Sequence, residues 1–238
     1  MATILITGAN RGIGLEHTRQ ALATGDTVIA TCRHPESAAE LADLADKYGD
    51  NLRIEEFDVT SGESACALVG RLDGTPIDVL INNAGYQGPG TWNVEANFQA
   101  LGSIDYDIWR DILEINLLGA MRATEALKDN VAASDRKVII MMSSDLASIG
   151  RNTIGTTHSY RTSKAALNML AKGLAVDLEK EGVTVVALSP GWTQTDMGGP
   201  KAIWTVEESV TNQRKVIAGL GLEDSGKFYN LQGEELPW

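Results

Sequence analysis

Two side chains that could move a proton lie four residues apart in the segment SYRTSKAAL, residues 159–167. They are Tyr160 and Lys164, and residues at this spacing share one face of a helix. A tyrosine hydroxyl ordinarily ionises at about pH 10, so it exchanges protons poorly at neutral pH. A lysine ammonium one turn away would lower that pKa. Ordinary helices also carry such pairs, so the rest of the chain must decide between the two interpretations.

Apolar strands alternate with helical segments around this pair. We predict strands at 2–8, 26–32, 52–59, 77–85, 136–144, 182–191 and 226–231, and helices at 13–24, 35–49, 62–72, 105–130 and 158–181. This alternation predicts an α/β fold, a doubly wound parallel sheet with helices on both faces. We find no linker that would divide the chain, so we expect a single domain over residues 1–238.

The first strand runs into its helix through a glycine-rich turn, LITGANRGIG, at residues 5–14. Backbone amides at a helix N-terminus can hold a pyrophosphate, and glycines let the backbone approach it closely. The alternative is a turn that merely needs glycine's conformational freedom. Because the turn belongs to the first βα unit, we interpret it as a dinucleotide-binding turn.

Five motifs in register along nearly the whole chain resemble the classical short-chain dehydrogenase/reductase family. They are TGANRGIG (7–14), NNAG (82–85), INLLG (115–119), the Tyr160-x-x-x-Lys164 pair and LSPGWTQTDM (188–197). The resemblance implies a Rossmann-like fold and hydride transfer between a nicotinamide cofactor and a carbonyl or alcohol. Residues 159–178, residues 189–199 and the ending ELPW are similar to the carbonyl-reductase-like branch, which includes the Sniffer carbonyl reductases and the bacterial C-factor proteins.

The resemblance implies a catalytic set of Asn116, Ser144, Tyr160 and Lys164. Tyr160 gives a proton to the substrate in reduction and takes it back in oxidation, and Lys164 also reaches the nicotinamide ribose. Asn116 holds a water in a proton relay to Lys164, or is a structural amide bonded to backbone. The working serine, which bonds the substrate oxygen, is Ser144 by its spacing, with Ser143 as the alternative. Both serines could also merely cap a strand end.

The end of the second strand favours NADP(H) over NAD(H). An acidic residue there would hold the ribose of NAD, whereas arginine suits the 2′-phosphate of NADP. The strand ends at Cys32, Arg33 follows, and no acid occurs before Glu36. Arg11 lies on the same side by family analogy. The alternative is that both arginines are solvated surface charges.

Other cofactor contacts follow from the same resemblance: Asp58 to the adenine, Asn83 and Gly85 to the adenosine ribose, and Thr195 near the nicotinamide carboxamide. The predicted cofactor site comprises Gly8, Asn10, Arg11, Gly12, Ile13, Gly14, Arg33, Asp58, Val59, Asn83, Ala84, Gly85, Tyr160, Lys164, Pro190, Gly191, Thr193 and Thr195. No metal is expected, because no cluster of ligand residues supports one.

Two segments, 86–102 and 192–206, should close over the substrate. Their larger apolar residues predict a mouth that accepts a hydrophobic ketone or aldehyde: Trp92, Phe98, Trp192, Met197 and Trp204. The alternative is that these side chains belong to the core or to a subunit contact. By the resemblance, the helices at 105–130 and 158–181 pair subunits into a homodimer or homotetramer.

Charge and composition narrow the classes of partner. The formal net charge of −12 disfavours nucleic acid and anionic membranes, and no apolar run approaches the length of a membrane span. The N-terminus has no secretory signal pattern. Cys32 and Cys66 form no CxxC pair, so we expect two buried free thiols and a cytoplasmic setting.

The best interpretation is an NADP(H)-dependent carbonyl reductase. One alternative is a dedicated alcohol, sugar or acyl-chain dehydrogenase. Another is an NADP(H)-binding regulatory or signalling protein of the C-factor type, with incidental turnover. The intact Asn–Ser–Tyr–Lys set favours an enzyme, because a sensor does not need a proton-transfer pair.

Overall fold

A single parallel sheet forms the centre of the molecule. The computed structural model describes residues 1–90 and 97–238. Within that part the strands are β1 (Thr3–Thr7), β2 (Thr27–Cys32), β3 (Leu52–Glu56), β4 (Val79–Asn82), β5 (Val138–Met142), β6 (Thr184–Ser189) and β7 (Phe228–Asn230). They lie in the order β3-β2-β1-β4-β5-β6-β7, and every neighbouring pair is parallel. The predicted Rossmann-like sheet is confirmed.

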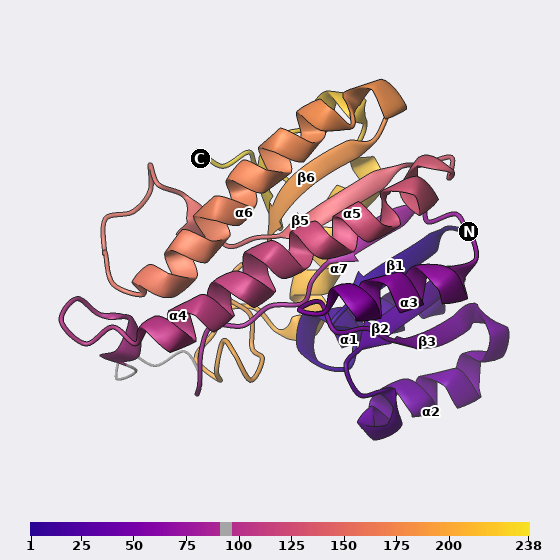
Figure 1. The fold of residues 1–238 in the computed structure, drawn as a ribbon, viewed down its shortest axis with the longest axis horizontal. Helices are drawn as coiled ribbons and strands as arrows, with labels where there is room; N and C mark the ends of the chain where they lie inside the picture. The colour runs from indigo at the N-terminus through magenta and orange to yellow at the C-terminus, as the bar shows by residue number, and fades with distance from the viewer. Residues whose placement is uncertain (91–96) are drawn as a thin grey trace.

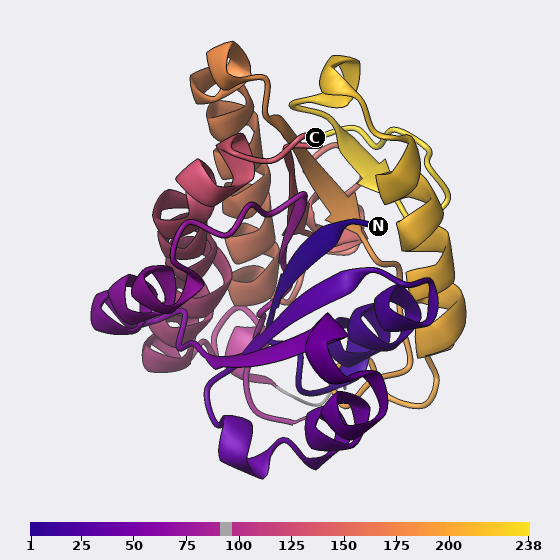
Figure 2. The same ribbon diagram turned by 90° about the vertical axis from the view of Figure 1, so that its right-hand side faces the viewer.

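Helices cover both faces of this sheet (Figures 1 and 2). One layer contains α3 (Gly62–Leu72), α4 (Tyr106–Leu113), α5 (Gly119–Ala132) and α6 (His158–Asp177). The other contains α1 (Gly12–Ala23), α2 (Ala39–Tyr48) and α7 (Val206–Gly219). Shorter helical turns are η1 (Pro35–Ser37), η2 (Gly49–Asn51), η3 (Asn97–Gln99), η4 (Glu114–Leu118), η5 (Asp145–Ala147), η6 (Glu179–Glu181) and η7 (Leu222–Asp224).

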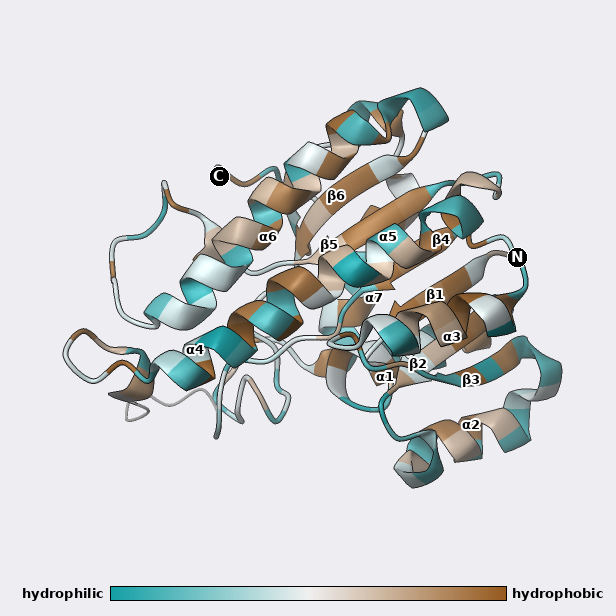
Figure 3. Ribbon diagram, viewed as in Figure 1, coloured by the Kyte–Doolittle hydropathy of each residue, from teal (hydrophilic) through white to brown (hydrophobic). Residues whose placement is uncertain are grey.

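Each face of the sheet has its own hydrophobic core, because successive strand residues point to opposite faces. In β5, Ile139 and Met141 pack on the side of α5 and α6, whereas Val138, Ile140 and Met142 pack on the side of α1. Strand β5 is therefore apolar along its whole length, as Figure 3 shows, whereas the edge strand β3 carries Arg53, Glu55 and Glu56. Continuous apolar runs are typical of parallel strands buried on both faces.

The helix predicted at 105–130 is divided into α4, the π-helical turn η4 and α5. The wide turn carries Asn116, whose side chain bonds the backbone of Tyr86. Such π-turns frequently mark functional sites. The helix predicted at 158–181 also ends earlier, with α6 stopping at Asp177 before the 3-10 turn η6.

Helix α7 was not among the predicted elements, although its start carries a capping box. The Thr205 hydroxyl accepts from the Glu208 N–H at 3.1 Å, and the Glu208 carboxylate accepts from the Thr205 N–H at 3.1 Å. The apolar period is obscured because two of the residues that α7 buries, Ser209 and Gln213, are polar. Their burial therefore hides the helix from a hydrophobicity pattern.

The two thiols differ in exposure. Cys32 is buried at the end of β2, and burial raises its pKa. Cys66 is exposed, so the prediction of two buried thiols is wrong for this residue. It lies on α3 beside Ala65 and two residues before Leu68, which carry the buried face of that helix. In residues 1–90 and 97–238 no helix is both long and apolar enough to span a bilayer.

Candidate active site

The predicted site residues converge at the carboxyl edge of the sheet. Gly8, Asn83, Ser143 and Pro190 each follow directly on the last residue of β1, β4, β5 or β6. The strand order reverses between β1 and β4, and ligands of open α/β sheets bind at such a reversal. Every predicted cofactor residue lies in the first turn of α1 or just beyond a strand's carboxyl end, except Tyr160 and Lys164 on α6.

The glycine turn is fixed against the end of β4. Gly8 and Gly12 have φ values of +65° and +53°, a region that favours glycine. A Cβ atom on Gly14 would lie 2.5 Å from Asn83 Nδ2. That amide donates to the Thr7 carbonyl at 2.8 Å and to the Gly8 carbonyl at 3.1 Å. The side chain of Asn83 therefore holds the turn together.

The start of α1 fits a pyrophosphate. Its N-cap residue, Arg11, makes no side-chain capping bond to the first-turn N–H groups. Helix N-termini leave these donors without intrahelical partners, and they carry the positive end of the helix dipole. With glycines at 12 and 14, the backbone donors of this turn can approach phosphate oxygens closely.

The segment after β6 lies against this turn. Arg11 Nη1 is 3.3 Å from Asp196 Oδ2, and both side chains are largely exposed. A Cβ atom on Gly12 would lie 3.4 Å from Thr195 Cγ2. Arg11 thus pairs with the segment at 192–206, and Thr195 lies beside the glycine turn.

Arg33 and Asp58 follow the strands β2 and β3, where the sequence predicts the adenosine end of the site. The Asp58 carboxylate accepts from the N–H and the hydroxyl of Thr60 at 2.9 and 2.8 Å. Burial raises the pKa of Asp58, but these bonds and the charges of Arg33 and Arg122 outweigh it and hold the pKa below its ordinary value. Arg33 therefore lies near the predicted adenine contact.

Tyr160 and Lys164 lie in the first two turns of α6, and both are buried. Lys164 Nζ is 5.8 Å from the centre of the Tyr160 ring and donates to the Met142 carbonyl at 2.8 Å. Burial lowers the pKa of Lys164 to about 8. Burial also raises the pKa of Tyr160 to about 12, although the hydrogen bond with Ser144 lowers it. The predicted lowering of the Tyr160 pKa by Lys164 is not found: burial dominates, only the Ser144 bond acts against it, and Tyr160 is held in its protonated form.

The structure separates the two candidate serines. Ser143 is buried, and its hydroxyl donates to Asn168 Oδ1 at 2.5 Å. Ser144 is half-buried, and its hydroxyl is hydrogen-bonded to Tyr160. It also accepts from the Leu146 N–H at 3.2 Å, which caps the turn η5. Of the two serines, Ser144 is therefore the one that contacts Tyr160.

Asn116 is bonded to protein groups through its amide. Its Oδ1 accepts from the Tyr86 N–H at 2.7 Å, and its Nδ2 donates to the Tyr86 carbonyl at 2.8 Å and to Ser163 Oγ at 2.9 Å. A Cβ atom on Gly85 would lie 3.5 Å from Asn116 Oδ1 and 3.6 Å from Lys164 Nζ. Asn116 therefore fixes the chain after β4 and faces the same glycine as Lys164.

A buried polar network that the sequence did not reveal fixes the end of β6. His17 Nε2 lies 3.1 Å from Gln213 Oε1, Gln213 Nε2 donates to Ser209 Oγ at 2.8 Å, and Ser209 donates to the Pro190 carbonyl at 2.7 Å. The Thr193 hydroxyl lies 3.1 Å from Ser209 Oγ. The Thr193 hydroxyl also donates to the Pro190 carbonyl at 3.0 Å, so it is engaged within the protein.

His17 is held neutral at one end of that network. Burial lowers its pKa to about 4, and the nearby Arg214 charge acts in the same direction against the bond with Gln213. Because the Gln213 NH₂ group donates to Ser209, its oxygen faces His17, which donates from Nε2. The sequence held one signal of this network, namely the polar residues Ser209 and Gln213, which lie four apart on the same face of α7.

Four of the residues predicted at the substrate mouth are described, and Trp92 lies outside the described residues. Phe98 covers Gly88, and the Trp204 ring packs on Gly191. Trp192 is exposed, and its Nε1 donates to the Gly198 carbonyl at 2.8 Å. Two buried glutamines, Gln87 and Gln99, were not predicted to belong to this region.

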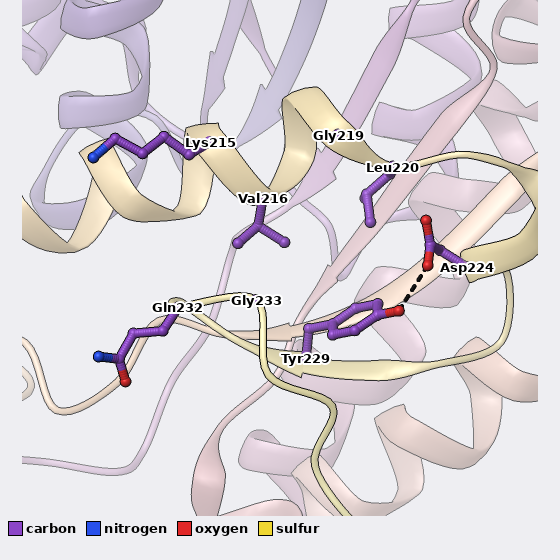
Figure 4. A pocket seen from close by; sticks show the side chains of 8 residues that line it. All are labelled: Lys215, Val216, Gly219, Leu220, Asp224, Tyr229, Gln232 and Gly233. Carbon is purple, nitrogen blue, oxygen red and sulfur yellow. Dashed lines mark hydrogen bonds between the residues drawn. The ribbon is translucent and has the colours of Figure 1, made fainter.

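A separate cavity of about 330 Å³ lies beside the C-terminal end of α7 and the turn after β7 (Figure 4). Its polar residues include Asp224 and Tyr229, whose hydroxyl donates to that carboxylate at 2.7 Å. None of its lining residues belongs to the predicted site, so it is distinct from the edge described above. Among the described residues, no three His, Cys, Asp or Glu side chains are grouped to hold a metal ion.

Residues 2–205 match the family of short chain dehydrogenases, and the chain belongs to that family. It is therefore an oxidoreductase with the Rossmann-like fold of that family. The C-signal protein of Myxococcus xanthus is 42% identical over 163 residues, which are 68% of this chain and 93% of that protein.

Solved structures resemble the whole chain. The carbonyl reductase Sniffer of D. melanogaster has a TM-score of 0.88 and 35% identity, with 100% of both chains covered. The NADPH-bound carbonyl reductase from chicken fatty liver has a TM-score of 0.90 and 33% identity, covering 100% of this chain and 99% of that one. The predicted resemblance to this branch is confirmed.

Proposed function

We propose that this oxidoreductase is an NADP(H)-dependent carbonyl reductase. The observation that carries the proposal is the grouping of a buried, protonated Tyr160 with the Ser144 hydroxyl and Lys164. This group lies at the same sheet edge as a glycine turn that fits a pyrophosphate.

The side chains divide the reaction between them. When bound, the nicotinamide supplies or accepts the hydride. Ser144 binds the substrate oxygen, and Tyr160 donates its proton to that oxygen as negative charge develops there. Lys164 supplies the positive charge that steadies the resulting phenolate. Lys164 and Asn116 together form the inner end of a relay that returns a proton to Tyr160 after it has protonated the substrate. Oxidation of an alcohol uses the same groups in reverse.

The cofactor is proposed to be NADP(H). Arg33 follows β2 where NAD-binding folds place an acidic residue, and it lies near Asp58. The NADPH-bound carbonyl reductase among the similar structures supports the same preference. The other cofactor contacts are proposed as the sequence predicts them. The side chain of Asn83 is the exception, because it is bonded to the backbone of the glycine turn.

The substrate is proposed to be a hydrophobic aldehyde or ketone. Phe98, Met197 and Trp204 belong to the two segments beside the site, and Trp192 adds an exposed ring. Helices α5 and α6 are proposed to pair subunits into a homodimer or homotetramer. Leu118 beside α5 and Met169 and Val176 on α6 expose apolar side chains that support this pairing. A cytoplasmic location is proposed as well.

The first test is the oxidation of NADPH and of NADH over a panel of aldehydes, ketones and diketones. We expect turnover with apolar carbonyls, and a kcat/KM for NADPH at least about tenfold above that for NADH, since one charged contact contributes about 1.5–3 kcal/mol. Equal use of the two cofactors would contradict the NADP(H) preference.

A signalling role is the second candidate, and the similarity to C-signal favours it. It predicts tight NADPH binding, measured by fluorescence or calorimetry, with no carbonyl turned over anywhere in the panel. Turnover that is lost with the Tyr160 hydroxyl would count against it.

Replacing Arg33 by alanine is expected to weaken NADPH binding by about 10–100-fold and to change NADH binding by less than about twofold. The reason is that only NADPH carries the 2′-phosphate. Titration of both cofactors measures the effect. Lys180→Ala is the control, because Lys180 lies in η6 before β6, at the opposite edge of the sheet. An equal loss for both cofactors would refute the assignment of Arg33.

A further inference from the structure

The start of helix α6 is capped from a distant part of the chain. Its N-cap residue is Thr157, whose side chain makes no capping bond. An N-cap side chain ordinarily accepts from the N–H of the second or third helical residue, and the third residue here is Tyr160. Gln99 Oε1 accepts from the Tyr160 N–H at 3.0 Å across a sequence separation of 61 residues. Gln99 thus replaces the local cap.

Local sequence stabilises this helix start poorly. Thr156 and Thr157 have φ values of 57° and 46°, which β-branched residues rarely adopt. The Thr157 hydroxyl is used elsewhere, because it accepts from Arg161 Nε at 3.1 Å. The position of Tyr160 therefore depends on an acceptor from outside the helix.

Gln99 is itself held by a second buried glutamine. Its Nε2 donates to the Gln87 carbonyl at 2.8 Å, and Gln87 Nε2 donates to the Met197 carbonyl at 2.9 Å. Both residues are 5% exposed. Breaking one bond would leave a buried amide group without its partner, which is unfavourable. The bonds therefore join α6 to both segments beside the proposed substrate site.

We propose that Gln99 is a positioning residue for Tyr160, and that Gln87 ties this contact to the segment that carries Met197. The inference rests on the proposed function, because it takes Tyr160 as the proton donor. Gln99 acts through the Tyr160 backbone, so it sets where the hydroxyl lies relative to Ser144 without touching the substrate. Gln87 makes that placement depend on the segment after β6.

Hydrogen exchange of the Tyr160 amide and steady-state kinetics test the proposal in Gln99→Met. We expect this amide to exchange about 5–20-fold faster, while amides in the middle of α6 are unchanged. We expect kcat to fall about 10–100-fold, because small displacements of reacting groups have effects of this size. The Kd for NADPH should stay within about twofold, since the proposed cofactor site does not include Gln99. Gln232→Met, at an exposed position, is the matched control.

Gln99→Glu separates positioning from a merely structural role. In its ionised form the new carboxylate keeps an acceptor for the Tyr160 N–H but has no donor for the Gln87 carbonyl, so the variant is measured at a pH where this group is ionised. We therefore expect the Tyr160 amide to stay protected and kcat to stay within about fivefold, while KM for the carbonyl rises. Identical behaviour of the Met and Glu variants would overturn the proposal. Where Gln99→Met does not fold, Gln99→Asn replaces it, because the shorter side chain withdraws the oxygen from Tyr160.

The two proposals fail in different ways. Amide exchange does not require turnover, so fast exchange in Gln99→Met with no carbonyl reduction by the wild type would overturn the function and keep the capping contact. Reduction by the wild type with unchanged exchange and kcat in Gln99→Met would overturn the positioning role and keep the function.

Discussion

Tyr160→Phe is expected to lower kcat for carbonyl reduction by about 10²–10⁴-fold, the usual contribution of a positioned proton donor. The phenyl ring fills the same buried space, so only the hydroxyl and its bond with Ser144 are lost. Ser144 is half-buried and keeps its bond from the Leu146 N–H, so the change in the free energy of unfolding should be small. Rate measurements at saturating NADPH, with thermal unfolding alongside, test both expectations.

Tyr229→Phe is the matched control for this experiment. It also removes a bonded tyrosine hydroxyl, one that donates to Asp224 beside the separate cavity in Figure 4. We expect its kcat to stay within about twofold of the wild type, because surface changes away from the site have small effects. A similar kcat in both variants would contradict the proton-donor role of Tyr160.

Lys164→Met is expected to remove most of the reductase activity and to make the protein more stable at pH 7. Activity falls because the positive charge beside Tyr160 is lost, so the phenolate is no longer stabilised. Stability rises because the folded protein no longer buries an ammonium group. The fall of the Lys164 pKa from 10.5 to about 8 corresponds to about 3 kcal/mol. Loss of the bond to the Met142 carbonyl offsets about 1 kcal/mol of this gain.

The size of this gain in stability depends on pH. Below about pH 8 Lys164 is protonated in both the folded and the unfolded protein, so the cost of its burial is fully present. Between about pH 8 and 10.5 the folded protein loses this proton first, and the cost disappears. The advantage of Lys164→Met should therefore shrink across this range. Urea unfolding of both proteins at pH 7 and pH 10 measures it, and a less stable variant at pH 7 would refute the argument.

Most of the fold could be predicted from the sequence because its strands are buried on both faces. Apolar runs such as IDVLIN and KVIIMM, each followed by glycine or a polar residue, locate β4 and β5 without tertiary information. Helix α7 could not be found in this way, because Ser209 and Gln213 are buried through hydrogen bonds to Pro190 and His17 rather than through apolar contact.

The sequence predicted which residues form the candidate site, but not the direction in which the Tyr160 pKa is shifted. Motif spacing located Tyr160 and Lys164, but the direction of the Tyr160 pKa shift depends on burial, which spacing does not reveal. Ser143 and Ser144 are adjacent, and only the three-dimensional structure shows which one turns towards Asn168. Gln99 carries no motif and reaches Tyr160 only through the fold.

The strand order has a consequence for how the chain acquires its structure during synthesis. β1 lies inside the sheet, where it pairs with β2 and β4, and the Thr3 N–H bonds Asp78, 75 residues later. Both edges of β1 are therefore paired only after the chain has been synthesised through β4. Closing such long loops slows folding and leaves strand edges open to association meanwhile. The carboxyl edge that carries the candidate site is completed only when β6 and the segment after it have been made, so a nascent chain gains this edge late, with only α7, β7 and the C-terminal residues still to come.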